Sequence, residues 1–136
     1  MALAGRAANA RVERVERVER VLGPTGVDLT TKVSAVLGGG TRATAVASFV
    51  MPEHQFLVVT GTEAVARMAT GAAFTTWREP STLIVGEHEE AFAPVDAYQL
   101  MVESMSDRVA GGGGWTVPID ESLGVAWALD LVRSTG

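Results

Sequence analysis

The chain has 136 residues, 47% of them hydrophobic and 20% charged, with no cysteine and a formal net charge of −5. A chain of this length and composition can bury a core within one domain, which excludes disorder by composition. The absence of cysteine excludes disulfides, thiolate nucleophiles and Cys-ligated zinc or iron–sulfur sites.

The apolar content is high for a chain without a membrane-spanning segment, because the mean hydropathy is +0.21. Uninterrupted apolar runs, such as residues 83–85, are far shorter than the roughly 20 residues of a transmembrane helix. We therefore expect no membrane span, and we expect a partner chain to cover part of the apolar surface. Residues 1–6 lack the apolar stretch of a signal peptide, so a cytoplasmic location or an intracellularly assembled particle is expected.

The charge is unevenly distributed along the chain. Residues 1–22 contain five Arg and three Glu, whereas residues 23–136 contain six basic and thirteen acidic residues. An acidic body disfavours a broad phosphate-binding surface. We therefore expect no nucleic-acid partner, unless the N-terminal segment provides the contact.

The most distinctive segment is the triplet Val-Glu-Arg, which occurs three times in residues 12–20. A period of three does not match the period of two of an alternating strand, and it therefore predicts a helix that ends at Gly23-Pro24. This helix packs either on the chain's own sheet or on another subunit. Its apolar ribbon, which drifts around the helix, consists of Val12, Val15, Val18 and Val21.

Strands are predicted in the following part of the chain. Apolar and polar residues alternate over residues 27–37, as in a half-buried strand. Gly38–Gly40 and a β-prone run over residues 42–50 complete a predicted hairpin, and residues 55–60 predict a third strand.

The middle of the chain predicts a short helix and a second hairpin. Residues 60–63 have the spacing of a helix capping box, so a short helix is expected up to Gly71. Residues 74–78 and 81–86 predict the two arms of a hairpin. A helix that continues to Trp77 is the alternative.

The clearest helix spans residues 94–109. Residues 115–119 then predict an edge strand, because Pro118 has no amide to donate to a central ladder. Large apolar residues occupy every second position at Val125, Trp127, Leu129 and Leu131, so we prefer a strand over residues 125–132 and keep a helix as the alternative. The apolar face of the clear helix consists of Tyr98, Met101, Val102, Met105 and Val109.

Together these segments predict an α+β fold. We expect an antiparallel sheet of about five to seven strands, one or two packed helices and an N-terminal amphipathic helix. Residues 1–24 are expected to form that helix, and residues 25–136 a single α+β domain.

His54 and His88 are the two histidines and the weak candidates for ligand or metal binding. Both lie in polar segments that predict exposed turns, and neither has a second histidine at a chelating spacing. The glycine runs at residues 38–40 and 111–114 do not match phosphate-binding motifs. We therefore expect no metal site and no cofactor.

The residues favour an interaction role over a catalytic one, since no catalytic motif is recognisable. Trp115 follows four glycines, and a bulky side chain on a flexible loop suits a lid or a docking contact. We interpret the chain as a non-enzymatic structural subunit of a homo-oligomer or larger assembly, for example a virus particle. The alternative is a small-molecule-binding protein or small enzyme with an aromatic-lined pocket that uses His54 or His88. The interface candidates are Val12, Val15, Val18, Val21 and Trp115.

Overall fold

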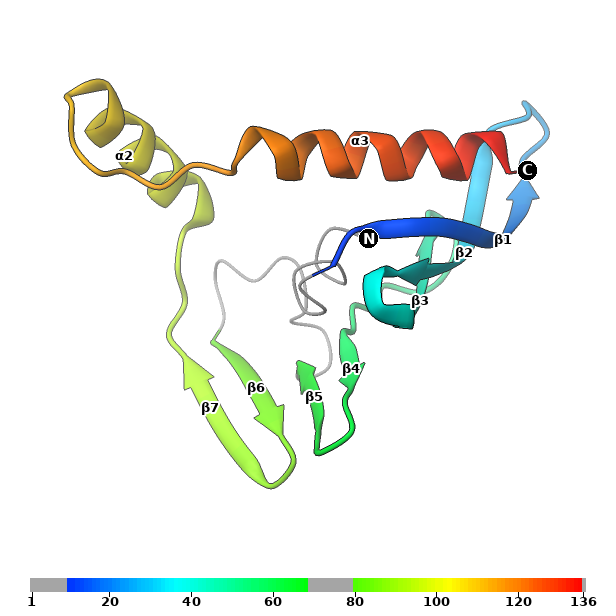
Figure 1. Cartoon of the computed structure of the whole chain (residues 1–136), viewed down its shortest axis with the longest axis horizontal. Coiled ribbons are helices and arrows are strands. Elements are labelled where there is room, and N and C mark those ends of the chain that lie inside the picture. Colours follow the sequence, from blue (N-terminus) through cyan, green and yellow to red (C-terminus); the bar gives the residue numbers. More distant parts are fainter. Residues whose placement is uncertain (1–9, 69–79, 136) are drawn as a thin grey trace. The chain divides into compact units, whose positions relative to one another are not determined.

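The computed structural model describes residues 10–68 and 80–135, and its contacts divide the chain into two compact units. Unit 1 comprises residues 1–51 and 117–136, and unit 2 comprises residues 52–116. The described residues form an α+β fold with two antiparallel sheets and two α-helices (Figure 1). The single sheet of five to seven strands is thus replaced by one sheet of three strands and one of four. The segment predicted as a hairpin arm or helix around Trp77 lies outside the described residues.

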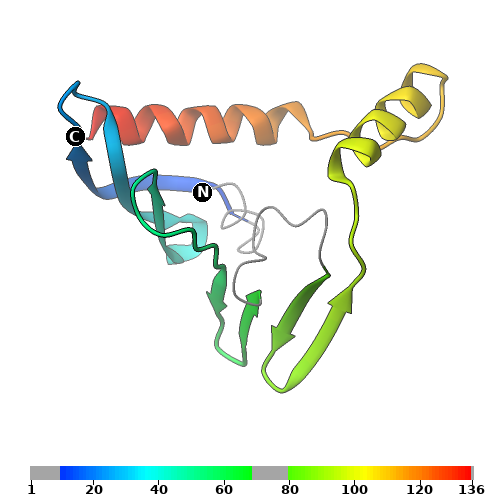
Figure 2. The same ribbon diagram turned by 180° about the vertical axis from the view of Figure 1, so that it is seen from behind.

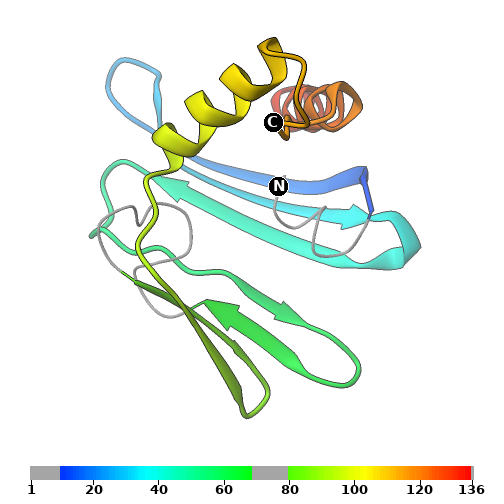
Figure 3. The ribbon, with the colours of Figure 1, turned by 90° about the vertical axis from the view of Figure 1, so that its left-hand side faces the viewer.

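Unit 1 is a three-stranded sheet in the order β1-β2-β3, with helix α3 on one side (Figure 3). The β2–β3 hairpin confirms the hairpin predicted between residues 27 and 50. Gly39 and Gly40 at its turn have positive φ angles of 74° and 81°, a conformation that glycine adopts at low cost. The elements are β1 (Val12–Leu22), β2 (Asp28–Leu37), the 3-10 turn η1 (Gly38–Gly40), β3 (Arg42–Ser48) and α3 (Ile119–Ser134).

Residues 12–22 form the edge strand β1, so the predicted N-terminal helix is wrong. β1 pairs antiparallel with β2, and its register shifts between Val12 and Arg14 and again between Val15 and Arg17. Glu13 and Glu16 are the additional residues at these β-bulges. A triplet that contains a bulge therefore advances only two positions along β2. Because β1 and β2 are paired, the boundary expected after residue 24 falls inside their hairpin.

The bulges keep the first valines of the triplets on one face of the sheet. No bulge separates Val18 from Val21, so three residues of regular strand turn Val21 to the opposite face. The exposed fraction of Val21 is accordingly 57%, whereas that of Val12 is 8%. The valines on the common face, Val12, Val15 and Val18, lie opposite Leu37, Ala35 and Val33 of β2.

Helix α3 covers this valine face and forms the core of unit 1 with it. Arg11 Nη2 lies 3.0 Å from Asp120 Oδ2 in the first turn of α3, and Arg20 Nη2 donates to the Val132 carbonyl in the last turn. α3 therefore runs parallel to β1, as Figures 1 and 2 show. The buried core residues are Val12, Ala35, Leu37 and Ala128, against which Ala10, Val15, Ala43 and Leu131 pack.

The helix α3 corrects two predictions, because neither residues 125–132 nor residues 115–119 form a strand. Pro118 is the N-cap, and its carbonyl oxygen accepts hydrogen bonds from the amides of Glu121 and Ser122. Proline is tolerated at the start of a helix because the first amides have no intrahelical partner. The alternating pattern was misleading because α3 has apolar residues on both of its sides.

Unit 2 contains the second sheet, whose strands follow in the order β4-β5-β6-β7, and helix α2. β4 and β6 confirm the strands predicted over residues 55–60 and 81–86, although β4 is shorter. The bounds are β4 (Val58–Thr60), β5 (Val65–Met68), β6 (Ser81–Val85), β7 (His88–Phe92) and α2 (Ala97–Val109).

Strand β5 occupies the place of the predicted short helix. The amide of Gly61 donates to the carbonyl of Ala64 at 2.9 Å, which closes a tight turn between β4 and β5. β5 also pairs with β6 on its other side. The capping-box spacing therefore belongs to a hairpin loop, where pairing with two strands overrides the local helix signal.

Helix α2 confirms the helix predicted over residues 94–109. Asp96 is its N-cap, since its carboxylate accepts hydrogen bonds from the amides of Tyr98 and Gln99 at 2.9 and 3.1 Å. The helix begins after this cap at Ala97. Neither described helix combines the length and apolarity that crossing a membrane would require.

Candidate functional site

Helix α3 presents one apolar side to the sheet and a further apolar series along an exposed flank. Its inner side packs on the sheet through Ala128 and Leu131. On its outer side, Ile119, Leu123 and Trp127 follow at intervals of four residues and are 74%, 62% and 47% exposed. A helix with one packed face ordinarily presents polar residues to water on the other face. We call Ile119, Leu123 and Trp127 the outer stripe.

Helix α2 also presents an apolar face without burying any of its residues. The face is the one that the sequence predicts, and its members lie at the helical spacing of three and four residues. The exposed side chains are Tyr98, Met101, Val102, Met105 and Val109.

The four-glycine loop that precedes Trp115 is held against α2. The hydroxyl of Ser104 donates to the Trp115 carbonyl at 2.6 Å, and Arg108 Nη1 donates to the Gly114 carbonyl at 3.4 Å. Gly114 lies so close to the helix that a Cβ atom there would overlap the Ser104 carbonyl oxygen. The side chain of Trp115 is 59% exposed. The loop therefore presents a large apolar side chain to solvent from a backbone that is held by hydrogen bonds.

The valines of the triplets have different environments. Val12 belongs to the buried cluster and Val15 packs against it, so these two side chains contribute to the core of unit 1. Val18 is half-buried on the same face. Val21 is exposed on the opposite face, which makes it the member of the ribbon that is most accessible to another chain.

The two histidines lie in unit 2, and both are exposed. The ring of His54 lies 5.4 Å from the ring of Phe56 at an angle of 40°. His88 is the first residue of β7 and pairs with Val85, which corrects the prediction that it lies in a turn. Across residues 10–68 and 80–135, no group of three or more His, Cys, Asp or Glu is placed to hold a metal ion.

The face of the unit 1 sheet opposite α3 carries polar side chains. Arg17 of β1, Ser34 of β2 and Thr44 of β3 are cross-strand partners in one row. Lys32 and Arg42 lie two residues from Ser34 and Thr44, and therefore on the same face. The cross-strand partners of Lys32 and Arg42 on this face are Glu19, Val46 and Val36. We call Arg17, Lys32, Ser34, Arg42 and Thr44 the polar face.

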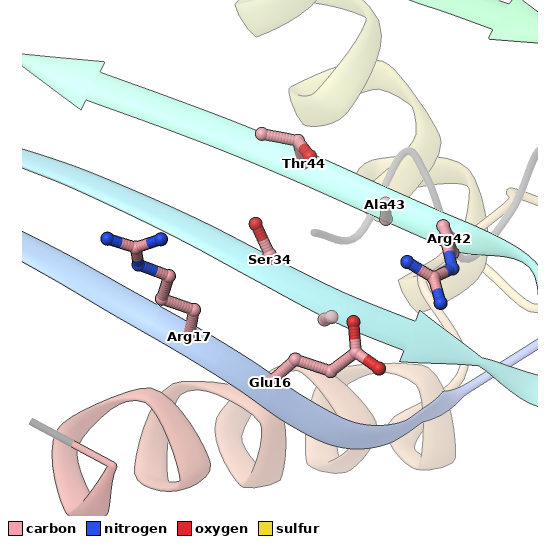
Figure 4. Close-up of a pocket in the computed structure, with 7 residues that line it drawn as sticks. Glu16, Arg17, Ser34, Arg42, Ala43 and Thr44 are labelled. Atoms are coloured by element: carbon pink, nitrogen blue, oxygen red, sulfur yellow. The ribbon is translucent and has the colours of Figure 1, made fainter.

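A hollow of about 390 Å³ lies at this part of the sheet (Figure 4). Two guanidinium groups and two hydroxyl groups border it, and no aromatic side chain does. This hollow therefore differs from the aromatic-lined pocket of the alternative interpretation. Its lining residues are Glu16, Arg17, Ser34, Ala35, Arg42, Ala43 and Thr44.

The cations of the polar face are only partly neutralised. Arg17 Nε lies 3.0 Å from Glu19 Oε1, and the two side chains are 72% and 45% exposed. An exposed ion pair of this kind contributes about 0–1 kcal/mol, so a competing anion can replace the carboxylate. Neither Lys32 nor Arg42 forms an ion pair with another described residue.

Sequence reasoning missed both the outer stripe and the polar face. The strands predicted over residues 115–119 and 125–132 obscure the stripe, because they assign Ile119 and Trp127 to two different strands. The alternation of Lys32 with Ser34, and of Arg42 with Thr44, places each pair on one strand face. The alignment of Arg17 with them depends on the bulge at Glu16, which no local pattern predicts.

No protein-family model, no curated protein and no solved structure matches this chain. The interpretation of both sites therefore depends on their geometry and chemistry alone.

Proposed function

We propose that this chain is a non-enzymatic structural subunit that associates with further copies of itself, alone or within a larger assembly. The observation that carries the proposal is the apolar character of α3 on both sides. The inner side is covered by the chain's own sheet, whereas Ile119, Leu123 and Trp127 are exposed. A contiguous series of large, exposed apolar side chains is typical of a surface that binds another protein.

The energetic argument concerns the outer stripe. Burying one large apolar side chain stabilises a complex by about 1.5–3 kcal/mol. The stripe extends over about 12 Å, because Trp127 lies eight positions after Ile119 and the helix rises about 1.5 Å per residue. A strip of this length matches the contact between two crossing helices.

The charges at the two ends of α3 favour a second copy of the same helix as the occupant. Asp120 and Glu121 lie in the first turn, and Arg133 lies in the last turn. Two antiparallel copies of α3 would bring the acidic end of each helix toward the basic end of the other. Their opposed macrodipoles add to this attraction. Such a contact has two-fold symmetry and uses the same surface on both copies.

The first test is the mass of the protein in solution, measured by size-exclusion chromatography with light scattering. We expect a species at a multiple of the chain mass of 14.2 kDa at micromolar concentration. A monodisperse monomer under these conditions would contradict the proposal.

A matched pair of variants locates the interface. Leu123→Gln removes an apolar side chain from the middle of the outer stripe. Leu100→Gln makes the same change on α2, at a leucine that is 53% exposed against 62% for Leu123. We expect only Leu123→Gln to raise the dissociation constant, by about tenfold or more for the loss of at least 1.4 kcal/mol per contact. Equal effects of the two substitutions would exclude the outer stripe as the interface.

A further inference from the structure

The net charge of the chain conceals a separation of charge between its two units. Unit 1 contains eight basic and seven acidic residues, whereas unit 2 contains three basic and nine acidic residues. The acidic character that disfavours a phosphate-binding surface is therefore a property of unit 2. Within unit 1, the distribution of charge over the two faces of the sheet decides which anions can bind.

The polar face combines the side chains that contact phosphate groups in proteins. Arginine and lysine supply charged donors, and serine and threonine supply hydroxyl donors, to phosphate oxygens. Arg17, Ser34 and Thr44 form one cross-strand row, and the hollow brings Arg42 beside them. Figure 4 shows these side chains on three neighbouring strands, around a hollow that is open to solvent.

The adjacent carboxylates weaken this surface without abolishing it. Glu16 and Glu19 pair with Arg14 and Arg17 at 2.9 and 3.0 Å. Each pair joins residues two positions apart on an exposed strand, where an ion pair contributes about 0–1 kcal/mol. A polyanion that contacts several cations at once can compete with such pairs, because its binding releases condensed counterions.

We propose that the polar face binds the phosphate backbone of a nucleic acid. Two guanidinium groups and two hydroxyl groups border the hollow, together with the carboxylate of Glu16, which the donors outnumber. No aromatic side chain on which bases could stack lines it, so its contacts are with phosphates rather than with bases. Binding is accordingly independent of sequence and sensitive to salt. An assembly of several copies would align several polar faces, and the affinity for one long strand would rise through multivalency. The inference does not require that assembly, because each copy carries a complete polar face.

The test is the fluorescence anisotropy of a labelled oligouridylate, titrated with the full chain at several salt concentrations between about 50 and 200 mM. We expect saturable binding at low salt that weakens as the salt concentration rises. In the variant Arg17→Gln/Arg42→Gln we expect the affinity to fall by about tenfold or more, because two charged donors are lost. The slope of log K against log salt should decrease in magnitude by about 1.4, for two phosphate contacts on a single strand.

The control variant Arg67→Gln/Arg108→Gln removes the same two charges from β5 and from the last turn of α2. It should retain the affinity of the original chain, and circular dichroism should show that both variants are folded. Equal losses in the two variants would reduce the binding to an effect of net charge and overturn the inference. Absence of binding at low salt, or binding of a polyglutamate peptide as tight as that of the oligouridylate, would also overturn it.

Discussion

The guanidinium Nη2 of Arg20 donates a hydrogen bond of 2.6 Å to the carbonyl oxygen of Val132. Val132 lies in the last turn of α3, where carbonyl groups have no intrahelical partner and where a positive charge is favourable. Arg20 also lies 3.4 Å from Asp28 Oδ2, and its side chain is only 21% exposed. One arginine of the triplet repeat therefore attaches the C-terminal helix to the N-terminal strand.

Replacing this arginine should destabilise unit 1. We expect Arg20→Met to lower the free energy of unfolding by about 1–3 kcal/mol, because a partly buried carbonyl loses a charged donor. Arg17→Met is the matched control, since Arg17 has the same position in its triplet but is 72% exposed. Its effect should stay within about 0.5 kcal/mol. Urea denaturation followed by circular dichroism measures both values, and equal values would contradict the role of the Arg20–Val132 contact.

Deleting single residues from β1 tests the bulges. Glu16 is the additional residue of one bulge, so its removal should leave Val15 and Arg17 opposite their partners Ala35 and Ser34. Glu19 is paired with Lys32 in a regular part of the strand. Its removal shifts the register of the residues on one side of the deletion by one position, and their side chains then lie on the opposite face of the sheet. We expect the Glu16 deletion to retain cooperative thermal unfolding and the Glu19 deletion to lose much of its stability. The reverse order of melting temperatures would show that the bulge is located elsewhere.

The contact between α3 and the sheet leaves little space at Ala128, which is 3% exposed. Ala128→Leu should lower the free energy of unfolding by about 1–3 kcal/mol, because the added atoms force the helix away from Leu37 and its neighbours. Ala126→Leu makes the same change on the exposed side of α3 and should leave the stability of unit 1 unchanged. A comparison of the two denaturation curves distinguishes the faces; a tolerated Ala128→Leu would place the core elsewhere.

The loop after α2 depends on a close approach of two backbones. Gly114→Ala would place a methyl group on the Ser104 carbonyl oxygen, so we expect the loop to detach from the helix. Hydrogen exchange of the amides in the second half of α2 and in the loop should then become faster. Gly113→Ala is the control, because a Cβ atom at Gly113 has no neighbour within 4 Å. Unchanged exchange in Gly114→Ala would show that the loop does not need this approach.

The elements that were predicted correctly depend on local patterns. The β2–β3 hairpin follows from alternating polarity and a glycine turn. Helix α2 follows from an apolar face of period 3.6 and from Asp96, which caps its N-terminus. Both signals lie within the segment itself. The position of His88 was predicted wrongly, because it begins strand β7 rather than lying in a turn.

The failures share a different cause. β1 was interpreted as a helix because its period is three, yet pairing with β2 absorbs one residue of a triplet at each of two bulges. The pattern of residues 125–132 predicts a strand because apolar residues lie on more than one side of α3. The same residues therefore fit both the period of two of a strand and the period of 3.6 of a helix. β5 was interpreted as a helix because a capping-box spacing precedes it, whereas its two neighbouring strands determine its conformation.

The α+β class, the absence of cysteine chemistry, helix α2 and the β2–β3 hairpin follow from local sequence, because propensity, capping and turn residues act over a few positions. The placement of the Val-Glu-Arg triplets in an edge strand under α3, and the shared face of Arg17, Ser34 and Thr44, depend on contacts between distant segments. The physical reason is register: a bulge moves every later side chain to the other face, and only the partner strand determines where the bulge occurs.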